Sequence, residues 1–213
     1  MRTDDSFSIP KPVLARMPRY RNYLTNKKSQ GFERISSTVI AADLGLNPVQ
    51  VRKDLAYIND SGKPRTGFDV KTLTDDIERY LGYNHPKSAI LVGAGNLGQA
   101  LLAYEGFSEY SLRILAAFDI DPDIIGQSIH GKPVYAMTAL REKIVEHDVK
   151  IAIVTVPARN AQSVCEQLAL SGIEAIWNFA PVHLEAPDNV IIQNEDIAAS
   201  LAFLYGKLEQ SSK

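Results

Sequence analysis

The sequence of 213 residues has little cysteine, no long apolar run and no repeated or low-complexity segment. Cys165 is its one cysteine, which excludes an internal disulfide and a zinc site built on cysteines. Because it lies in a segment of helical pattern, 162–170, we expect it to pack in a core. No run approaches the roughly 20 apolar residues that are needed to cross a bilayer. We therefore expect neither a disulfide scaffold nor a membrane protein.

Two further absences concern targeting and metals. The first residues, Met-Arg-Thr-Asp-Asp-Ser, have no apolar core of a secretory signal, which predicts a cytoplasmic protein. The histidines do not have the spacing of metal ligands, so no metal site is expected. They are His85, His130, His147 and His183.

Charge is unevenly distributed along the chain, although the formal net charge is only −2. Residues 1–87 hold 15 basic and 10 acidic side chains, whereas residues 88–213 hold 8 and 15. Within 11–65 there are 11 basic and 4 acidic residues. A basic first half joined to an acidic second half has two interpretations: the first half meets a polyanion, or its charge excess is only a solvated face.

Three helices are predicted in the basic half. Apolar residues recur at helical spacing over 12–30, and Ser36-Ser37 offers a cap for a second helix. Asn47-Pro48 begins a third helix, because Asn caps well and Pro at the first helical position loses no needed hydrogen bond. Two helices joined by a short Gly45-containing turn have the outline of a helix-turn-helix. A small hairpin, or wing, over 62–70, a short helix over 74–81 and a linker over 82–86 follow.

From residue 88 onward, strands and helices alternate. The strands are apolar throughout, which is typical of a parallel sheet covered on both faces, and the order predicts a doubly wound sheet. Strands are expected at 88–92, 113–119, 150–156, 173–177 and 190–193. Helices are expected at 96–105, 138–147, 158–170 and 196–210.

The first of these strands runs into a G-x-G-x-x-G turn, Gly93-Ala-Gly-Asn-Leu-Gly98. Gly93 permits the tight turn, Gly95 lets the backbone approach a pyrophosphate, and Gly98 allows the next helix to pack on the strand. Asp119 ends the next strand, where a carboxylate accepts hydrogen bonds from a ribose and repels a 2′-phosphate. The pattern therefore predicts NAD+ or NADH rather than their phosphorylated forms.

The last helix carries a wide apolar surface, with Ile197, Leu201, Leu204 and Leu208 among its residues. Such a surface must be buried. It is either an ordinary helix on the sheet or a helix packed against, or exchanged with, a second subunit.

Together these motifs resemble the Rex family of redox-sensing transcriptional repressors. The matching segments run in order from about residue 8 to 206. They are Ile9-Pro-Lys11, Ser36-Ser37, Val51-Arg-Lys-Asp54, Gly93-Ala-Gly-Asn-Leu-Gly98, Ala117-Phe-Asp-Ile-Asp-Pro122, Thr155-Val-Pro157 and Asn178-Phe-Ala-Pro181.

The resemblance implies an α/β protein with an N-terminal winged-helix domain (1–84) that binds DNA and a Rossmann-like, doubly wound NAD(H)-binding domain (85–195). It also implies a C-terminal dimerisation helix (196–213) swapped between two identical subunits. Such a homodimer binds palindromic double-stranded operator DNA when NAD+ prevails and leaves it when NADH binds.

The resemblance also assigns roles to residues. Those that would meet DNA are Ser36, Ser37, Asn47, Gln50, Arg52, Lys53, Tyr57, Lys63 and Arg65. Those that would meet the cofactor are Gly93, Ala94, Gly95, Asn96, Leu97, Gly98, Tyr104, Asp119, Thr155, Val156, Pro157, Asn178, Phe179 and Ile197. The chain departs from the family pattern at Asn22, which replaces an arginine of the first helix, and in the wing around Pro64. We expect Asp54 to orient a neighbouring arginine rather than to touch DNA.

Two alternatives compete with the repressor. An NAD-dependent dehydrogenase needs a positioned acid or base and a substrate domain, for which the second half of the chain has little room. A nucleotide-dependent assembly protein would bind no DNA. We expect a regulator and not an enzyme.

Overall fold

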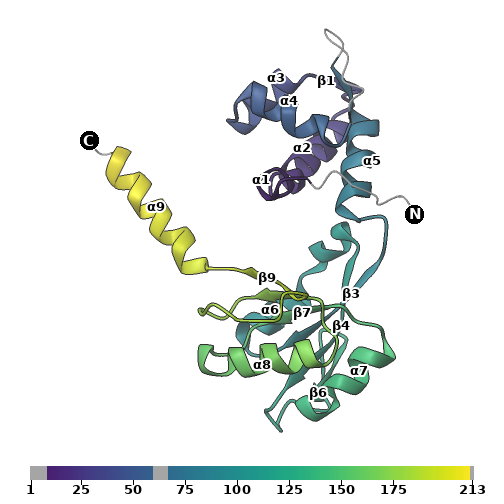
Figure 1. Cartoon of the computed structure of the whole chain (residues 1–213), viewed down its shortest axis with the longest axis vertical. Helices are drawn as coiled ribbons and strands as arrows, with labels where there is room; N and C mark the ends of the chain where they lie inside the picture. The colour runs from purple at the N-terminus through teal and green to yellow at the C-terminus, as the bar shows by residue number, and fades with distance from the viewer. Residues whose placement is uncertain (1–8, 60–66, 212–213) are drawn as a thin grey trace. The chain divides into compact units, whose positions relative to one another are not determined.

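The computed structural model describes residues 9–59 and 67–211, and its internal contacts divide the chain at residue 85 into two units. Figure 1 shows that the first unit is mainly helical, whereas the second is a sheet with helices packed on it. Each unit has buried apolar clusters of its own.

In the described residues of the first unit, five helices surround one core, to which Tyr20, Ile40, Leu55 and Ile77 contribute. The segment 12–30, predicted as one helix, is divided in two. Pro18 has no N–H to donate to the carbonyl four residues before it, so the helix is interrupted there. The helices are α1 (Lys11–Leu14), α2 (Met17–Ser29), α3 (Ser37–Leu44), α4 (Pro48–Ala56) and α5 (Val70–Leu81).

Side-chain caps fix where α3 and α4 begin. The Ser36 hydroxyl accepts a hydrogen bond from the Val39 N–H at 3.2 Å, and the Asn47 side chain accepts from the Val49 N–H at 2.8 Å. Gly45 ends α3 in the left-handed conformation, with φ of 62°. The short turn between these helices confirms the predicted helix-turn-helix.

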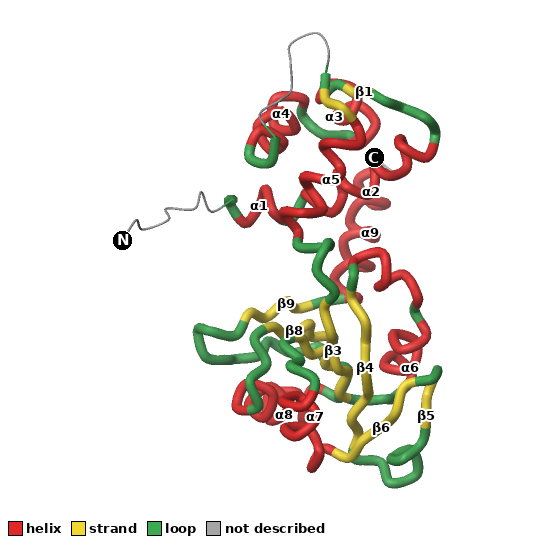
Figure 2. The backbone as a smooth tube through the Cα atoms, turned by 90° about the vertical axis from the view of Figure 1, so that its right-hand side faces the viewer, coloured by secondary structure: helices red, strands yellow, loops and turns green. Residues whose placement is uncertain are grey.

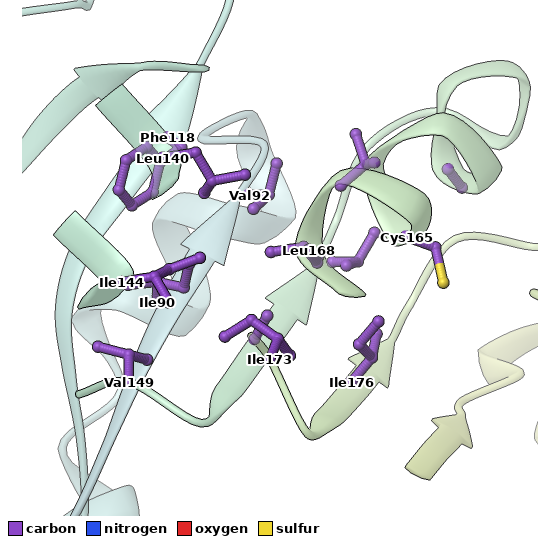
Figure 3. Close-up of a cluster of buried hydrophobic side chains, with 14 of the residues drawn as sticks. Ile90, Val92, Phe118, Leu140, Ile144, Val149, Cys165, Leu168, Ile173 and Ile176 are labelled. Carbon is purple, nitrogen blue, oxygen red and sulfur yellow. The ribbon is translucent and has the colours of Figure 1, made fainter. Parts of the chain in front are cut away.

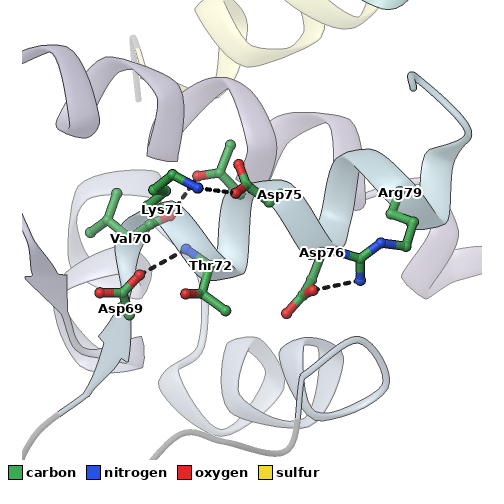
Figure 4. A network of polar contacts seen from close by, with 8 residues as sticks. Asp69, Val70, Lys71, Thr72, Asp75, Asp76 and Arg79 are labelled. Atoms are coloured by element: carbon green, nitrogen blue, oxygen red, sulfur yellow. Dashed lines mark hydrogen bonds and ion pairs between the residues drawn. The ribbon is translucent and has the colours of Figure 1, made fainter.

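The strand pairing of this unit differs from the prediction. A hairpin was expected within 62–70, but β2 (Phe68–Asp69) pairs antiparallel with β1 (Arg34–Ile35), which precedes α3. Val70, expected in a strand, begins α5 because the Asp69 carboxylate accepts from the Thr72 N–H and caps the helix (Figure 4). The tip of the expected wing lies outside the described residues.

The second unit is built on a sheet of order β5-β6-β4-β3-β7-β8-β9. All neighbours are parallel except β5 and β6. These two strands were not predicted, because β5 has only two residues and β6 contains Pro133, which signals against a strand. The strands are β3 (Lys87–Val92), β4 (Leu112–Asp119), β5 (Ser128–Ile129), β6 (Lys132–Ala136), β7 (Ile151–Val154), β8 (Ala175–Asn178) and β9 (Ile191–Asn194).

Helices cover both faces of this sheet, as Figure 2 shows. On one face, α7 (Leu140–Glu146) and α8 (Ala158–Leu170) pack on Ile90 and Phe118, and the buried Cys165 belongs to this cluster (Figure 3). On the other face, α6 (Asn96–Ala103) and the 3₁₀ helix η1 (Glu105–Tyr110) pack on Leu91 and Ile153. The doubly wound sheet and the packing role of Cys165 are therefore confirmed.

The last helix, α9 (Ile197–Ser211), follows β9. Its described side chains are all exposed, including the apolar Ile197, Leu201, Leu204 and Leu208. The described part of the second unit therefore leaves this apolar surface uncovered.

Candidate nucleotide site and DNA-binding surface

The strand order places a crevice at one end of the sheet. The chain runs from β3 to β4 and β6 on one side, and then returns to β7 on the other side of β3. Ligands of open α/β sheets bind at such a reversal, outside the carboxyl ends of the strands. A pocket of about 890 Å³ lies there, lined by the turn after β3, the end of β4 and the loop after β7.

The glycine-rich turn lines this pocket, and its geometry requires glycine at two positions. Gly93 has a φ of 98°, and a Cβ there would lie 2.9 Å from Val156 Cγ1. A Cβ on Gly98 would collide with the Gly93 carbonyl oxygen. At Gly95, by contrast, a Cβ would meet no atom of the described chain within 4 Å. The turn is thus tight on its inner side and open at Gly95.

Hydrogen bonds hold this turn in place. The Thr155 hydroxyl donates to the Gly93 carbonyl at 2.6 Å, and the Gln99 amide donates to the Ala94 carbonyl at 2.9 Å. Among the described residues no side chain caps the amino end of α6. Its first N–H groups are therefore available to an anion, which the helix dipole also favours.

Asp119, at the end of β4, connects two segments of the pocket. One carboxylate oxygen accepts from the Ala94 N–H at 2.6 Å, and the other accepts from the N–H groups of Ile120 at 2.7 Å and Asp121 at 3.0 Å. A carboxylate offers about four acceptor positions. One position is therefore left for a hydroxyl donor in the pocket.

Only some of the residues predicted to meet the cofactor line the pocket. Thr155, Val156, Pro157 and Phe179 line the pocket together with Gly93, Ala94, Gly95 and Asp119. The α6 residues Asn96, Leu97 and Gly98 are not among the lining residues, nor are Tyr104, Asn178 and Ile197.

The Asn178 side chain is engaged with its own loop. It is completely buried, and its amide donates to the Val182 carbonyl and the Asn194 side chain, both at 2.8 Å. Its oxygen accepts from the Ala180 N–H at 3.0 Å. Asn178 therefore shapes the loop that carries Phe179 into the pocket.

Tyr104 and Ile197 are exposed, at 58% and 64%. The Tyr104 ring meets Phe107 edge to face, with centroids 4.9 Å apart. Phe107 in turn contacts Trp177, and Trp177 contacts Phe179 of the pocket. Tyr104 thus reaches the pocket only through a row of aromatic rings.

More than half of the residues that line the pocket were not predicted from the sequence. Most of these residues follow a parallel strand or lie on α6 or α8, and that placement is their signal. Ile120, Asp121 and Pro181 stand in two of the segments that carry the resemblance, but no role was predicted for them. Arg159 brings a positive charge to this wall. The lining residues that were not predicted are Val92, Gln99, Phe118, Ile120, Asp121, Ile124, Met137, Arg159, Asn160, Ser163, Val164, Gln167 and Pro181.

In the first unit, one face of α4 is free of the core. Val51 and Leu55 are buried, whereas Val49, Arg52 and Lys53 are exposed. The exposed residues are spaced by three and four positions, so they share one face of the helix. Two cations on a helix-turn-helix second helix form a surface that suits a nucleic acid.

The other residues predicted to meet DNA lie around this helix. Ser36 and Asn47 cap α3 and α4, Ser37 is the first residue of α3, and Tyr57 is exposed at the end of α4. Gln50 is partly buried. Lys63 and Arg65 lie outside the described residues.

Asp54, on the inner side of α4, is buried and does not face solvent. It accepts two hydrogen bonds from Arg16 and one from the Tyr20 hydroxyl. Burial first, and then the bond to Asp54, raises the pKa of Tyr20 to about 12. Asp54 therefore orients an arginine as expected, but its partner is Arg16, which lies just before α2 and 38 residues away in the sequence.

Within residues 9–59 and 67–211, no three His, Cys, Asp or Glu side chains come together as metal ligands. In the same residues no helix is long and apolar enough to cross a membrane.

A helix-turn-helix unit followed by a sheet with a dinucleotide-type pocket defines a nucleotide-responsive transcription regulator. Two family models agree with this class. One described as "CoA binding domain" matches residues 84–182, and one described as "Putative DNA-binding protein N-terminus" matches residues 8–56.

The chain belongs to the Rex family of redox-sensing transcriptional repressors, which are regulators rather than enzymes. It is 45% identical to the redox-sensing transcriptional repressor Rex of Treponema denticola, over 91% of this chain and 92% of that one. The repressor of the same name from Bacteroides thetaiotaomicron is 36% identical, over 96% and 93% of the two chains.

Two solved structures of a Rex-family repressor match this chain over nearly its whole length. RSP, a Rex-family repressor, in complex with β-NAD+ and operator DNA matches with a TM-score of 0.91 and 31% identity, over 97% of this chain and 95% of that chain. RSP in complex with β-NADH matches with a TM-score of 0.87 and 32% identity, over 96% of each chain.

Proposed function

We propose that this chain is a cytoplasmic, homodimeric repressor that binds NAD+ and NADH in the β3–β7 pocket and double-stranded operator DNA through α4. NADH weakens its hold on DNA, so transcription follows the NADH/NAD+ ratio. The observation that carries this proposal is the pocket itself: a glycine turn open at Gly95, beside the Asp119 carboxylate, in a chain that also has a cationic helix-turn-helix. The complexes of RSP with both cofactors and with operator DNA support it.

The pocket suits a dinucleotide in three respects. The uncapped amino end of α6 suits the pyrophosphate, with Gly93, Ala94, Gly95, Asn96, Leu97 and Gly98 supplying backbone. The free acceptor position of Asp119 suits a ribose hydroxyl. Thr155, Val156, Pro157 and Phe179 form the wall proposed for the nicotinamide, with Asn178 holding Phe179 and Tyr104 behind it.

For DNA, we assign Arg52 and Lys53 to phosphates or guanine edges, Gln50 to a base edge, and the Ser36, Ser37, Asn47 and Tyr57 positions to the flanking backbone. Lys63 and Arg65 of the wing add charge. Because Lys and Arg contacts to phosphate release counterions, binding weakens steeply with salt.

The dimer is proposed from α9. Its exposed apolar residues need a cover, and a second subunit supplies one when Ile197 reaches the partner's cofactor pocket. A cofactor shifts a two-state equilibrium only by its differential affinity for the two states. An apolar nicotinamide pocket favours the neutral ring of NADH. Closure then changes the spacing of two recognition helices, which must stay close to one turn of DNA, roughly 34–36 Å, or a multiple.

A mobility-shift assay on a palindromic operator tests the proposal, with no cofactor, NAD+ or NADH at one salt concentration. The expected result is firm binding with NAD+ and release with NADH. Equal binding under all three conditions would contradict a redox sensor, and no operator binding at all would favour the nucleotide-dependent assembly protein.

A further inference from the structure

The start of α9 is joined to the pocket wall through two neighbouring strands of the second unit. β8 leads into Phe179 of the pocket, and β9 leads through Glu195 into α9 (Figure 1). The two strands pair in parallel, so their carboxyl ends lie side by side. The Phe179 N–H donates to the Val154 carbonyl of β7, and the Glu195 N–H donates to the Asn178 carbonyl, both at 2.8 Å. The backbone at Phe179 and at Glu195 is therefore held by the sheet.

The Trp177 side chain contacts both of these residues. Its ring packs on that of Phe179, with centroids 4.7 Å apart, and its indole N–H donates to Glu195 Oε1 at 2.9 Å. An indole N–H is a donor only, and a hydrogen bond to a carboxylate is roughly twice as strong as one to a neutral group. Trp177 thus connects a ring of the pocket wall to the segment that enters α9.

The surroundings of this contact leave little freedom on either side. Phe107 of η1 meets the Trp177 ring edge to face, with centroids 5.8 Å apart, and both rings pack on the apolar cluster of that sheet face. Asp196, the residue after Glu195, caps α9 by accepting from the Ala199 N–H at 2.8 Å. Closely packed side chains transmit a displacement rather than absorb it. A change at one end of the contact must therefore be accommodated at the other.

We infer that Trp177 and Glu195 are positioning residues that transmit the state of the pocket to the start of α9. A cofactor that displaces the Phe179 ring moves the indole, and the indole moves Glu195 together with the first turn of the helix. Neither Trp177 nor Glu195 lines the pocket, so both act on its occupant through Phe179. The inference rests on the proposed function, in which the cofactor and α9 act together on DNA binding.

The first experiment breaks the contact and leaves the pocket wall in place. Trp177→Phe keeps a ring beside Phe179 but has no N–H to donate, and Glu195→Ala removes the acceptor. Mobility shift of the full-length protein measures operator affinity with NAD+ and with NADH, and calorimetry without DNA measures NADH affinity. The effect of NADH on operator affinity should fall by about tenfold in both variants, as expected for the loss of a hydrogen bond to a charged group. NADH affinity should stay unchanged.

Two further variants act as controls for the acceptor. Glu195→Gln keeps an oxygen that accepts from the indole and should retain more of the NADH effect than Glu195→Ala. Glu142→Ala removes an exposed acid of α7 that does not line the pocket, and it should behave as wild type. If Glu195→Gln is no better than Glu195→Ala, the charge acts rather than the hydrogen bond, and the inference is wrong.

Other results of the first experiment would also overturn the inference. One is release by NADH that is unchanged in Trp177→Phe and Glu195→Ala. Another is a loss of release that only follows a loss of NADH affinity, which a merely structural role would produce. If NADH does not release the wild-type protein from its operator, the proposed function itself fails. If Trp177→Phe does not fold, the Glu195 variants still decide the inference.

The second experiment tests whether the two residues act as one unit. Because Trp177→Phe and Glu195→Ala break the same bond, their combination should reduce the NADH effect no further than either change alone. Losses that add would show two separate roles and overturn the link.

The third experiment observes the contact directly. Trp177 is the one tryptophan of the sequence, so its indole N–H gives a single nuclear magnetic resonance signal. Glu195→Ala should make this N–H exchange faster with solvent, because its acceptor is lost. An exchange rate that is the same in wild type and Glu195→Ala would show that the bond is not formed in solution.

Discussion

Asp119 anchors the glycine-rich turn and also offers one free acceptor to the pocket. Its removal therefore acts on the turn and on the ligand together. We expect Asp119→Ala to lower the binding affinity for both NAD+ and NADH by at least about tenfold, since each hydrogen bond to a charged group contributes about 1.5–3 kcal/mol.

Titration calorimetry with each cofactor measures this effect. Asp123→Ala is the control, because Asp123 is an exposed acid on the same loop that does not line the pocket. Equal loss of affinity in both variants would point to net charge rather than to the Asp119 contacts.

Tyr20 gives the first unit a pH dependence at high pH. Its pKa is raised from 10.0 to about 12 in the folded chain, so the neutral phenol is favoured by folding. The associated stability is present below pH 10 and is lost as the pH rises through about 12.

Urea unfolding between pH 9 and 12 is the measurement. The free energy of unfolding of wild type should fall more steeply than that of Tyr20→Phe over this range. Parallel curves would show that the Tyr20 hydroxyl does not couple ionisation to folding.

The boundaries of helices and turns were predicted correctly from the sequence where a single residue sets the boundary. Asn47 and Pro48 predicted the start of α4, and the glycines at 93 and 98 predicted the turn after β3. The start of α5 was missed because Asp69 acts as its cap, which the alternation of Phe68 and Val70 concealed.

Features that depend on distant partners could not be predicted. Ile35 pairs with Phe68 across 33 residues, and Arg16 reaches Asp54 across 38. The α8 wall of the pocket, with Arg159 and Gln167, needs the order of the strands before it can be placed. Each of these contacts is set by the tertiary fold, and the sequence carries no local signal for it.

The exposed cationic face of α4 should be required for operator binding. The double variant Arg52→Ala and Lys53→Ala should abolish operator binding at moderate salt while NADH affinity stays unchanged. The cations face away from the core of the first unit, so their loss should not unfold it.

The matched control is a pair of exposed lysines in the second unit, Lys87→Ala with Lys150→Ala. Mobility shift at several salt concentrations is the measurement, and any residual binding should have a shallower salt dependence. Operator binding that survives the α4 double variant would show that α4 is not the reading helix.

For the whole molecule, the apolar surface of α9 predicts dependence on a second subunit. Truncation before Asp196 should give monomers in sedimentation velocity, because Ile197, Leu201 and Leu204 are then lost. Leu201→Glu with Leu204→Glu should have the same effect without shortening the chain. A dimer that persists in both variants would refute the exchanged helix.

The placement of Cys165 restricts which signals reach this repressor. The one thiol of the chain lies in the sheet core, and burial raises its pKa, so little reactive thiolate forms at neutral pH. Peroxide should therefore leave the affinity of the protein for DNA unchanged as long as the concentrations of NAD+ and NADH are held constant. An oxidant would then change transcription through the NADH/NAD+ ratio and not through oxidation of the Cys165 thiol. The repressor would respond to the supply of reducing equivalents rather than to oxidative damage.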